Sequence, residues 1–293
     1  MGNVYLPIFK YSFIIADYLM HICYAFAFNA KKTILSKVVI HMFEVFILSL
    51  VQGITEFLPI SSSSHLILVN NFSSFSVGNL LTDTSLHMGS FFAVVIYFFR
   101  DLINFGKNKK LLLLILVSSL PVLITGYLVN KFGLIENIRT VKIIGWMTLL
   151  FGVILYISDK MKTKRSLIKE FNFKIALIIG IVHSFSIIPG VSRSGIAITI
   201  SRFLGYDRYE SSKISFLLSI PTLGAVSIYS FFYIYKSKDI NIIEINFAAI
   251  LFSFVFSLIT IKYFLKYIQK FNLNIFVFYR VLIGVLILAY AYK

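Results

Sequence analysis

The sequence has few acidic residues and a single cysteine. Asp and Glu together number 12, against 28 Lys and Arg, and charged residues make up only 14% of the 293 residues. Soluble domains carry roughly 25% charged residues, so this composition excludes an ordinary soluble domain. Cys23 is the one cysteine, which excludes an intramolecular disulfide and leaves no cysteine framework for a zinc ion.

Apolar and basic residues are abundant instead. Hydrophobic residues make up 58% of the chain, including 31 Phe and 17 Tyr, as suits a lipid-facing surface with aromatic belts at its borders. A net charge of +16 is also found in proteins that bind nucleic acid. Here, however, the Lys and Arg residues lie in short loops between apolar runs, where basic residues set membrane orientation. We therefore predict an integral membrane protein that binds no nucleic acid.

Six apolar runs approach the length of a membrane-spanning helix, which needs about 20 mostly apolar residues. They are 84–99, 111–129, 141–158, 214–235, 246–265 and 275–292. Four other apolar runs are short or interrupted: 38–51, 66–72, 173–188 and 196–204. Such runs predict re-entrant or broken helices, which are tolerated at membrane depth only inside protein or beside a wet cavity.

Two polar clusters interrupt the apolar sequence beside these short runs. The first cluster, residues 52–65, reads Gln-Gly-Ile-Thr-Glu-Phe-Leu-Pro-Ile-Ser-Ser-Ser-Ser-His, and the second, residues 189–195, reads Pro-Gly-Val-Ser-Arg-Ser-Gly. Polar and ionisable groups are costly at membrane depth and are retained mainly where they serve function. We predict that the two clusters form one polar site.

Basic loops predict how the two clusters enter the membrane. The loops 100–110 and 160–174 are rich in Lys and Arg, so both are expected on the cytoplasmic side. The first cluster then enters from the outside and the second from the inside. This predicts inverted repeats, roughly 36–130 and 141–265, whose re-entrant helices meet near the midplane. The C-terminal span 275–292 follows the second repeat.

The N-terminal residues 1–35 form a separate extension to the membrane-embedded domain at 36–293. Residues 4–28 are apolar enough to lie on or cross the membrane, yet they include Lys10, Asp17 and His21. An extra span and an interfacial helix both remain open. No short apolar core followed by a small-residue cleavage site marks a signal peptide here.

The second cluster supplies a candidate anion site. The planar guanidinium of Arg193 pairs bidentately with phosphate or carboxylate and keeps its charge when desolvated. Ser192 and Ser194 would add donors, and a helix beginning after Ser194 would favour an anion at its N-terminus. The alternative is that Arg193 is a loop charge or pairs with an acid.

The first cluster supplies candidate catalytic groups. Gln52 and Glu56 lie four residues apart, which places them on one face of a helix. Glu56 would bind a divalent cation through oxygen or act as an acid or base, whereas Gln52 offers an oxygen but cannot titrate. Ser62 and His65 are a candidate pair for nucleophilic catalysis, and a metal-activated water is the other route. The alternative for this pair is a helix cap followed by a structural histidine.

Four polar residues outside the clusters are given other roles. His87 and His183 are predicted to pack in the interior. Tyr279 and Arg280 begin the last span, where they are expected to snorkel or to contact a lipid headgroup.

The two clusters together resemble the motifs of the bacterial undecaprenyl-diphosphate phosphatases, the bacitracin-resistance family. The shared patterns are Gln-Gly-x-x-Glu-Phe-Leu-Pro-x-Ser-Ser-x-x-His and Pro-Gly-x-Ser-Arg-Ser-Gly, and the resemblance extends over about 38–293. It implies an all-α polytopic protein of the bacterial inner membrane, often dimeric, with its site facing the periplasm. The implied reaction hydrolyses undecaprenyl diphosphate to undecaprenyl phosphate and phosphate, which recycles the lipid carrier for cell-wall synthesis.

The resemblance also assigns roles by motif position. It implies that Glu56 is the acidic residue, Ser62 the nucleophile and His65 the catalytic histidine. Ser192 and Arg193 become the phosphate-binding pair. A divalent cation, Mg²⁺ or Ca²⁺, is implied as well.

Three positions depart from the family pattern. Gln52 stands where the first acidic residue is usual, and with Glu56 it would hold the cation. Ser64 replaces a glycine, and Ala197 replaces a threonine whose hydroxyl Thr199 would supply instead. Two alternatives therefore stay open: a transporter that flips a polyprenyl phosphate without hydrolysis, and a paralogue that binds lipid without turnover.

Overall fold

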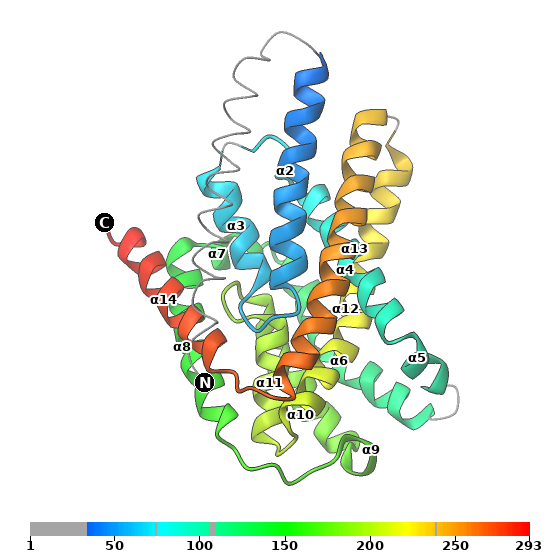
Figure 1. Cartoon of the computed structure of the whole chain (residues 1–293), viewed down its shortest axis with the longest axis vertical. Coiled ribbons are helices and arrows are strands. Elements are labelled where there is room, and N and C mark those ends of the chain that lie inside the picture. The colour runs from blue at the N-terminus through cyan, green and yellow to red at the C-terminus, as the bar shows by residue number, and fades with distance from the viewer. Residues whose placement is uncertain (1–33, 74, 106–108, 238) are drawn as a thin grey trace, which may run out of the picture. The chain divides into compact units, whose positions relative to one another are not determined.

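The computed structural model describes residues 34–73, 75–105, 109–237 and 239–293, and all regular structure in these ranges is helical (Figure 1). The predicted all-α class is therefore confirmed. Residues 45–293 form one compact unit, and the other unit, residues 1–44, is described only from Ile34, where α2 begins. The predicted extra span or interfacial helix within 1–35 falls on residues 1–33, outside the described residues.

Seven helices in the described ranges are long and apolar enough to cross a membrane. They are α2 (Ile34–Thr55), α4 (Leu80–Tyr97), α6 (Lys109–Lys131), α8 (Val141–Asp159), α12 (Arg208–Lys236), α13 (Ile240–Ile268) and α14 (Asn274–Ala291). Six of them correspond to the six long apolar runs, although α4 and α14 end two residues and one residue before the runs 84–99 and 275–292 do. The seventh corrects a prediction, because the helix containing 38–51 continues through Gln52 and Gly53 to Thr55 and is long enough to span.

Capping residues explain why several helices begin before their apolar runs. The Asn79 side chain accepts a hydrogen bond from Thr82 N, so α4 begins at Leu80. Asp207 accepts one from Glu210 N in the same way, so α12 begins at Arg208. Such caps satisfy the free amides of a first turn even where that turn is polar.

Both polar clusters interrupt helices, as expected for broken elements. The first cluster separates α2 from α3 (Ser62–Phe72), and the second separates α10 (Phe173–His183) and the 3₁₀ turn η1 (Ser184–Ile187) from α11 (Arg193–Phe203). Short helices α5 (Phe99–Phe105), α7 (Ile135–Ile138) and α9 (Leu167–Glu170) complete the order. The inverted relation between the two halves stays a prediction.

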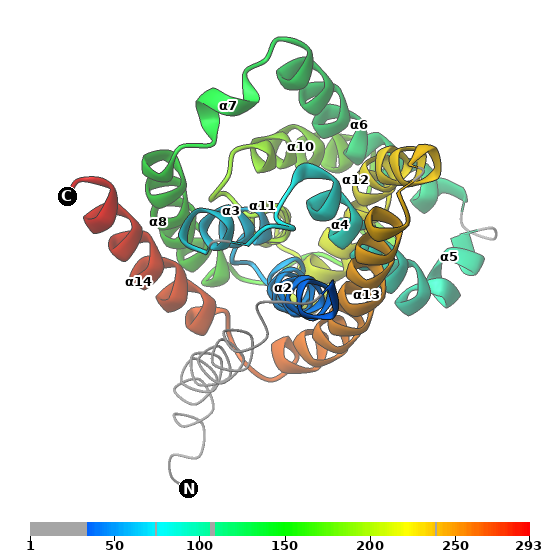
Figure 2. The same ribbon diagram turned by 90° about the horizontal axis from the view of Figure 1, so that it is seen from above.

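The broken helices lie inside a shell of longer ones. Figure 2 shows α3, α4 and α11 surrounded by α6, α8, α12, α13 and α14. Helix α4 packs against α12 and α13, α14 packs against α8, and α11 packs against α8 and α12. The contact between α4 and α13 requires Gly89, because a Cβ there would collide with the carbonyl oxygen of Ile250. The shell thus holds the polar clusters away from its apolar exterior.

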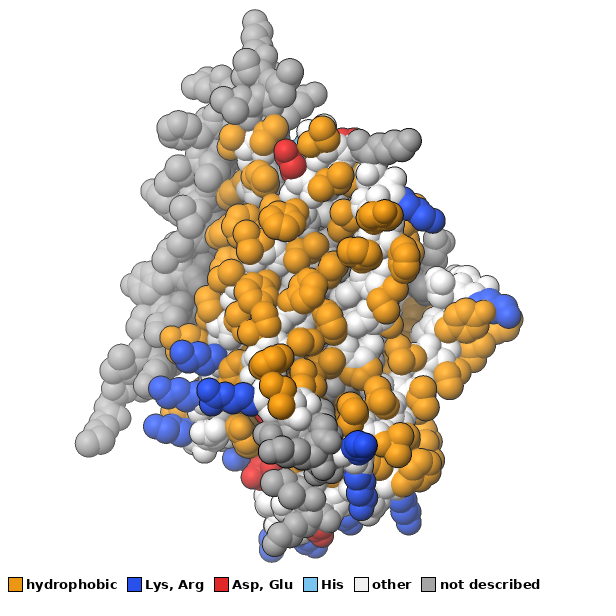
Figure 3. Space-filling view, turned by 90° about the vertical axis from the view of Figure 1, so that its right-hand side faces the viewer, with side chains coloured by type: hydrophobic (Ala, Val, Ile, Leu, Met, Phe, Trp, Pro, Cys, Tyr) orange, Lys and Arg blue, Asp and Glu red, His pale blue; other side chains and the backbone are white. Residues whose placement is uncertain are grey.

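The exterior carries many exposed apolar side chains. Phe231, Phe247 and Phe278 are 55%, 67% and 69% exposed, each on a different candidate span. Figure 3 shows apolar side chains over most of one face, with Lys and Arg gathered mainly below them. Soluble monomers rarely expose apolar patches of this extent, so this surface fits a multi-pass membrane protein.

Candidate active site

The carboxylate of Glu56 is the point at which the two polar clusters meet. Glu56 follows α2 and is 5% exposed. Its Oε2 accepts hydrogen bonds from Gln52 Nε2, at 2.9 Å, and from Ser62 Oγ. Its Oε1 lies 3.5 Å from Arg193 Nη2. The carboxylate and serine of the first cluster are thus assembled with the guanidinium of the second cluster, which is more than 100 residues away in the sequence.

Arg193 is the first residue of α11 and is the most accessible member of this group. Its side chain is 24% exposed, whereas that of Glu56 is 2% exposed. Its Nη1 donates to Thr222 Oγ1 on α12, at 3.4 Å. The guanidinium is therefore held beside the carboxylate while part of it remains open to an incoming anion.

The serines beside Arg193 make structural contacts. Ser192 Oγ accepts from Gly195 N at 3.1 Å and caps α11, and Ser194 Oγ donates to Leu58 O in the first cluster at 2.7 Å. Thr199 is buried at 3% exposure, six residues after Arg193, or about 9 Å along the helix axis. The structure therefore does not bring Thr199 to the guanidinium, and the phosphate-binding roles of all three hydroxyls stay predictions.

Strained turns place Ser62 and Arg193. Ser61 and Ser192 immediately precede α3 and α11, and they are the two non-glycine residues with positive φ in the described ranges, at 78° and 73°. Ser61 Oγ accepts from Gly190 N of the other turn at 3.3 Å. Residues held in this left-handed region cost free energy and are often found at functional sites. Ser64 fits this turn, with its Oγ 2.9 Å from Ser61 Oγ.

His65 does not pair with Ser62 in this structure. Its Nδ1 lies 2.6 Å from Ser61 O, and its Nε2 lies 2.7 Å from the Tyr279 hydroxyl. The two rings are stacked, with centroids 5.7 Å apart. Ser62 bonds to Glu56 instead, so His65 ties α3 to α14, and its catalytic assignment stays a prediction.

His87, for which a packing role was predicted, contacts the residues of the site. It projects from α4, with Nδ1 2.7 Å from Gln52 Nε2 and 3.4 Å from Glu56 Oε2. An unprotonated Nδ1 accepts from Gln52, whereas a protonated Nδ1 would donate to Glu56. Ser90, three residues later on the same helical face, also accepts from Gln52, at 3.3 Å.

Arg280 corrects the expectation of a snorkelling side chain. It is fully buried, and its Nη1 donates to Pro59 O and to Val191 O, each at 3.1 Å. Its Nη2 donates to Gly190 O at 2.7 Å. Broken helices leave carbonyls without partners, and Arg280 satisfies those of both turns at once. Tyr279 likewise faces inward, toward His65.

The oxygens near Glu56 are suitable for a hard cation. Gln52 Oε1 is buried and has no hydrogen-bond partner, and the Glu56 carboxylate lies beside the Gln52 amide. In the described residues no group of three or more His, Cys, Asp or Glu side chains forms a complete metal site. The donor set therefore suits Mg²⁺, which commonly takes one or two protein oxygens plus phosphate oxygens and water.

Comparisons with known proteins point to one family. A family model described as "Bacitracin resistance protein BacA" matches residues 45–286. The undecaprenyl-diphosphatase of Pelagibacter ubique is 44% identical over 257 residues, which cover 86% of this chain and 99% of the relative. Those of Elusimicrobium minutum and a Jannaschia species are 39% and 34% identical, over 83% and 86% of this chain and 95% and 99% of the relatives.

Proposed function

This chain belongs to the bacitracin resistance protein family, and we propose that it hydrolyses undecaprenyl diphosphate to undecaprenyl phosphate and inorganic phosphate. The reaction recycles the lipid carrier of cell-wall synthesis and confers resistance to bacitracin. Relatives named undecaprenyl-diphosphatase match over nearly their full lengths, and this supports the activity.

The observation that carries a mechanism is the hydrogen bond from Ser62 Oγ to Glu56 Oε2. A serine hydroxyl is a weak nucleophile until a neighbouring base takes its proton. In the proposed step, Ser62 Oγ bonds to the terminal phosphorus while its proton passes to Glu56. The bond to the bridging oxygen breaks, and undecaprenyl phosphate leaves. Water then hydrolyses the phosphoserine, which releases phosphate and restores Ser62.

Attack by water is the other route, because the same carboxylate would serve as its base. A water molecule beside Ser62 would lose its proton to Glu56 and bond to the terminal phosphorus directly. In this route no phosphoserine forms, and Ser62 only orients the water. The two routes share Glu56 and differ in the covalent intermediate.

Arg193 supplies the charge that a diphosphate needs. Its guanidinium offers paired N–H donors to phosphate oxygens, and its side chain stays partly exposed beside the buried carboxylate. Donors fixed where negative charge develops in the transition state usually give the largest catalytic contribution. His87 contacts Glu56 from the other side and is placed to exchange a proton with the carboxylate between steps.

A divalent cation, if bound, would be held by Gln52 Oε1 and Glu56. It would supply positive charge to the phosphate oxygens. Gln52 also donates to Glu56 and so fixes the orientation of the carboxylate. We further propose that the protein lies in the bacterial inner membrane with this site open to the periplasm, as the basic loops 100–110 and 160–174 favour. A homodimer stays a prediction.

Phosphate release from undecaprenyl diphosphate by purified protein tests this function. The wild-type protein is expected to release phosphate, whereas Arg193→Ala is expected to lower kcat/KM about 10²–10³-fold. Glu56→Gln should remove most of the wild-type activity, since an amide cannot accept the proton of the attacking hydroxyl or water. The control is Lys110→Gln, which removes an exposed basic side chain outside the site.

Two outcomes would contradict the proposal. Near wild-type phosphate release by folded Glu56→Gln or Arg193→Ala protein would remove these residues from the reaction. No phosphate release by wild-type protein that still binds the lipid would favour the transporter or the non-catalytic paralogue. Movement of a labelled polyprenyl phosphate between the leaflets of vesicles would separate those two.

A further inference from the structure

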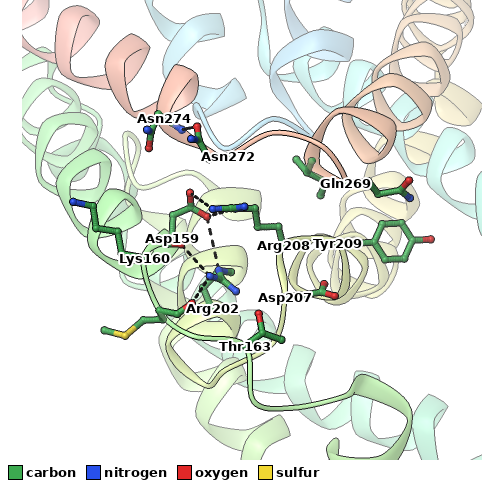
Figure 4. Close-up of a pocket in the computed structure, with 12 residues that line it drawn as sticks. Asp159, Lys160, Thr163, Arg202, Asp207, Arg208, Tyr209, Gln269, Asn272 and Asn274 are labelled. Atoms are coloured by element: carbon green, nitrogen blue, oxygen red, sulfur yellow. Dashed lines mark hydrogen bonds and ion pairs between the residues drawn. The ribbon is translucent and has the colours of Figure 1, made fainter.

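A second polar pocket lies at the far end of α11 from Arg193. Arg202 is nine residues further along the helix, about 14 Å by helical rise. Figure 4 shows the pocket between the ends of α8, α11 and α12 and the loop that joins α13 to α14. Its volume is about 660 Å³, and its charged lining residues are Asp159, Lys160, Arg202, Asp207 and Arg208.

One carboxylate in the pocket is shared by two arginines. Arg208 donates to both oxygens of Asp159, from Nε at 2.6 Å and from Nη2 at 3.1 Å. Arg202 Nε lies 3.8 Å from Asp159 Oδ1 (Figure 4). Asp159 Oδ2 also accepts from Leu273 N at 3.1 Å. The single negative charge of Asp159 therefore faces two guanidinium groups, and Arg208 makes the shorter, bidentate contact.

Arg202 is fixed in place by neutral groups. Its Nη1 donates to Tyr206 O at 2.6 Å, and its Nη2 donates to Asp159 O and Met161 O at 3.0 and 2.6 Å. Arg202 is 4% exposed, and its Nε has no hydrogen-bond partner. Carbonyl oxygens satisfy N–H groups but bring no net charge. Arg202 shares the Asp159 carboxylate with Arg208, and a buried cation that is incompletely paired is costly, so the pocket favours a bound anion.

The other charges do not remove this excess. The Asp207 carboxylate is used as the cap of α12, where it accepts from Glu210 N at 2.7 Å. Lys160, the residue after α8, is an exposed lining residue whose Nζ lies over the Tyr156 ring, 4.2 Å from its centroid. The Asp207 carboxylate keeps its negative charge in the cap, so the three cationic and two acidic side chains of the lining leave an excess of one positive charge.

We propose that this pocket binds the phosphate group of an anionic membrane lipid. The pocket is bordered by the ends of four candidate spans, at Asp159, Arg208, Ile268 and Asn274. Helix ends of this kind lie at the level of lipid headgroups, and basic pockets between membrane helices bind such headgroups.

Apolar side chains beside the pocket favour a lipid over a soluble anion. Ile268 forms part of the lining. Phe271 and Ile275 flank the lining residues in the sequence, and they are 50% and 43% exposed. A phosphate bound at Arg202, with Lys160 at the edge of the pocket (Figure 4), would leave the acyl chains of its lipid against these side chains. Inorganic phosphate has no acyl chain that could contact that apolar surface.

The test is lipid binding by the full chain. Purified protein in micelles of an uncharged detergent is titrated with phosphatidylglycerol, with phosphatidylcholine or with sodium phosphate, and the unfolding midpoint and apparent Kd are measured. Phosphatidylglycerol is expected to raise the midpoint, whereas phosphatidylcholine should not. Lys160→Gln should weaken the apparent Kd about fivefold, the expected loss for one basic side chain near a headgroup.

Two further variants make the test specific. Arg202→Gln should abolish the increase caused by phosphatidylglycerol, and Lys160→Gln keeps the test decisive if the Arg202 variant does not fold. Lys110→Gln is the control, since it also removes an exposed basic charge but does not line the pocket. Its apparent Kd should equal that of the wild type.

Each outcome decides the proposal. Binding of phosphatidylglycerol that is weakened about fivefold in Lys160→Gln and unchanged in Lys110→Gln supports the lipid site. An equal effect of sodium phosphate alone would overturn the lipid as ligand. No increase in midpoint with any of the probes, or equal weakening in the Lys110 and Lys160 variants, would overturn the pocket as an anion site.

Discussion

The turns at the two polar clusters have similar backbones and different chemistry. Each ends in a serine with positive φ that immediately precedes a helix, Ser61 before α3 and Ser192 before α11. The first turn presents Glu56 and Ser62, which are bonded to each other. The second presents Arg193, while its own serines are used to cap and anchor the helix. The same backbone turn thus positions a carboxylate–serine pair before α3 and an anion-binding arginine at the start of α11.

Contacts between the two turns fix the position of the carboxylate–serine pair relative to Arg193. Ser61 Oγ bonds to Gly190 N, Ser194 Oγ bonds to Leu58 O, and Arg280 donates to carbonyls of both turns. The distance from Glu56 to Arg193 is therefore set by a rigid polar frame rather than by the two charged side chains alone. Changes to the first turn should affect the reaction, and changes to the frame should affect folding.

The largest effect is expected from Ser62→Ala. If Ser62 is the nucleophile, its removal should lower kcat at least about 10³-fold, because water alone must then attack. The matched control is Ser63→Ala, since Ser63 is the next residue and its Oγ lies 3.4 Å from Ser61 Oγ. Phosphate release measured on both variants is compared with their unfolding midpoints. A loss of only about tenfold in Ser62→Ala would favour direct attack by water.

Arg280→Met should destabilise the protein by about 3–5 kcal/mol, because several buried carbonyls lose a charged donor. The unfolding midpoint in detergent should fall markedly. The activity of the fraction that remains folded should fall less than in Arg193→Ala, since Arg280 does not face the reacting groups. The control is Arg193→Met, which removes a partly exposed arginine of the same size. Equal midpoints for the two variants would show that the frame does not depend on Arg280.

Variants of His87 and His65 are expected to have smaller effects, and they compare the roles of the two histidines directly. His87→Gln should lower kcat about 10²-fold, the lower end for general acid–base catalysis, because it removes the imidazole that contacts Glu56. His65→Gln should act mainly through its lost bond to Tyr279, so Tyr279→Phe should reproduce its effect. A larger loss in His65→Gln than in His87→Gln, with Tyr279→Phe unaffected, would return the proton-transfer role to His65.

Local patterns in the sequence were enough to predict the spans and the polar clusters. The ends of the helices and the hydrogen-bond partners of the site residues depend on the folded chain. Apolar run length identifies a span, but Asn79 and Asp207 place the starts of α4 and α12 among polar residues. The spacing of Ser62 and His65 suggested a pair, yet the backbone turns His65 toward Tyr279, 214 residues away. His87 and Arg280 likewise take their roles from contacts with distant segments, which no single-sequence spacing encodes.

The smallest effect is expected from Ser194→Ala. Its hydroxyl donates to Leu58 O at 2.7 Å, and the loss of one such bond costs about 1 kcal/mol of stability. If Ser194 only anchors α11, the unfolding midpoint should fall slightly while KM and kcat stay near wild-type values. If it also binds phosphate, KM should rise with little change in midpoint. Steady-state phosphate release and thermal unfolding of this one variant therefore decide whether the second turn binds substrate through Arg193 alone.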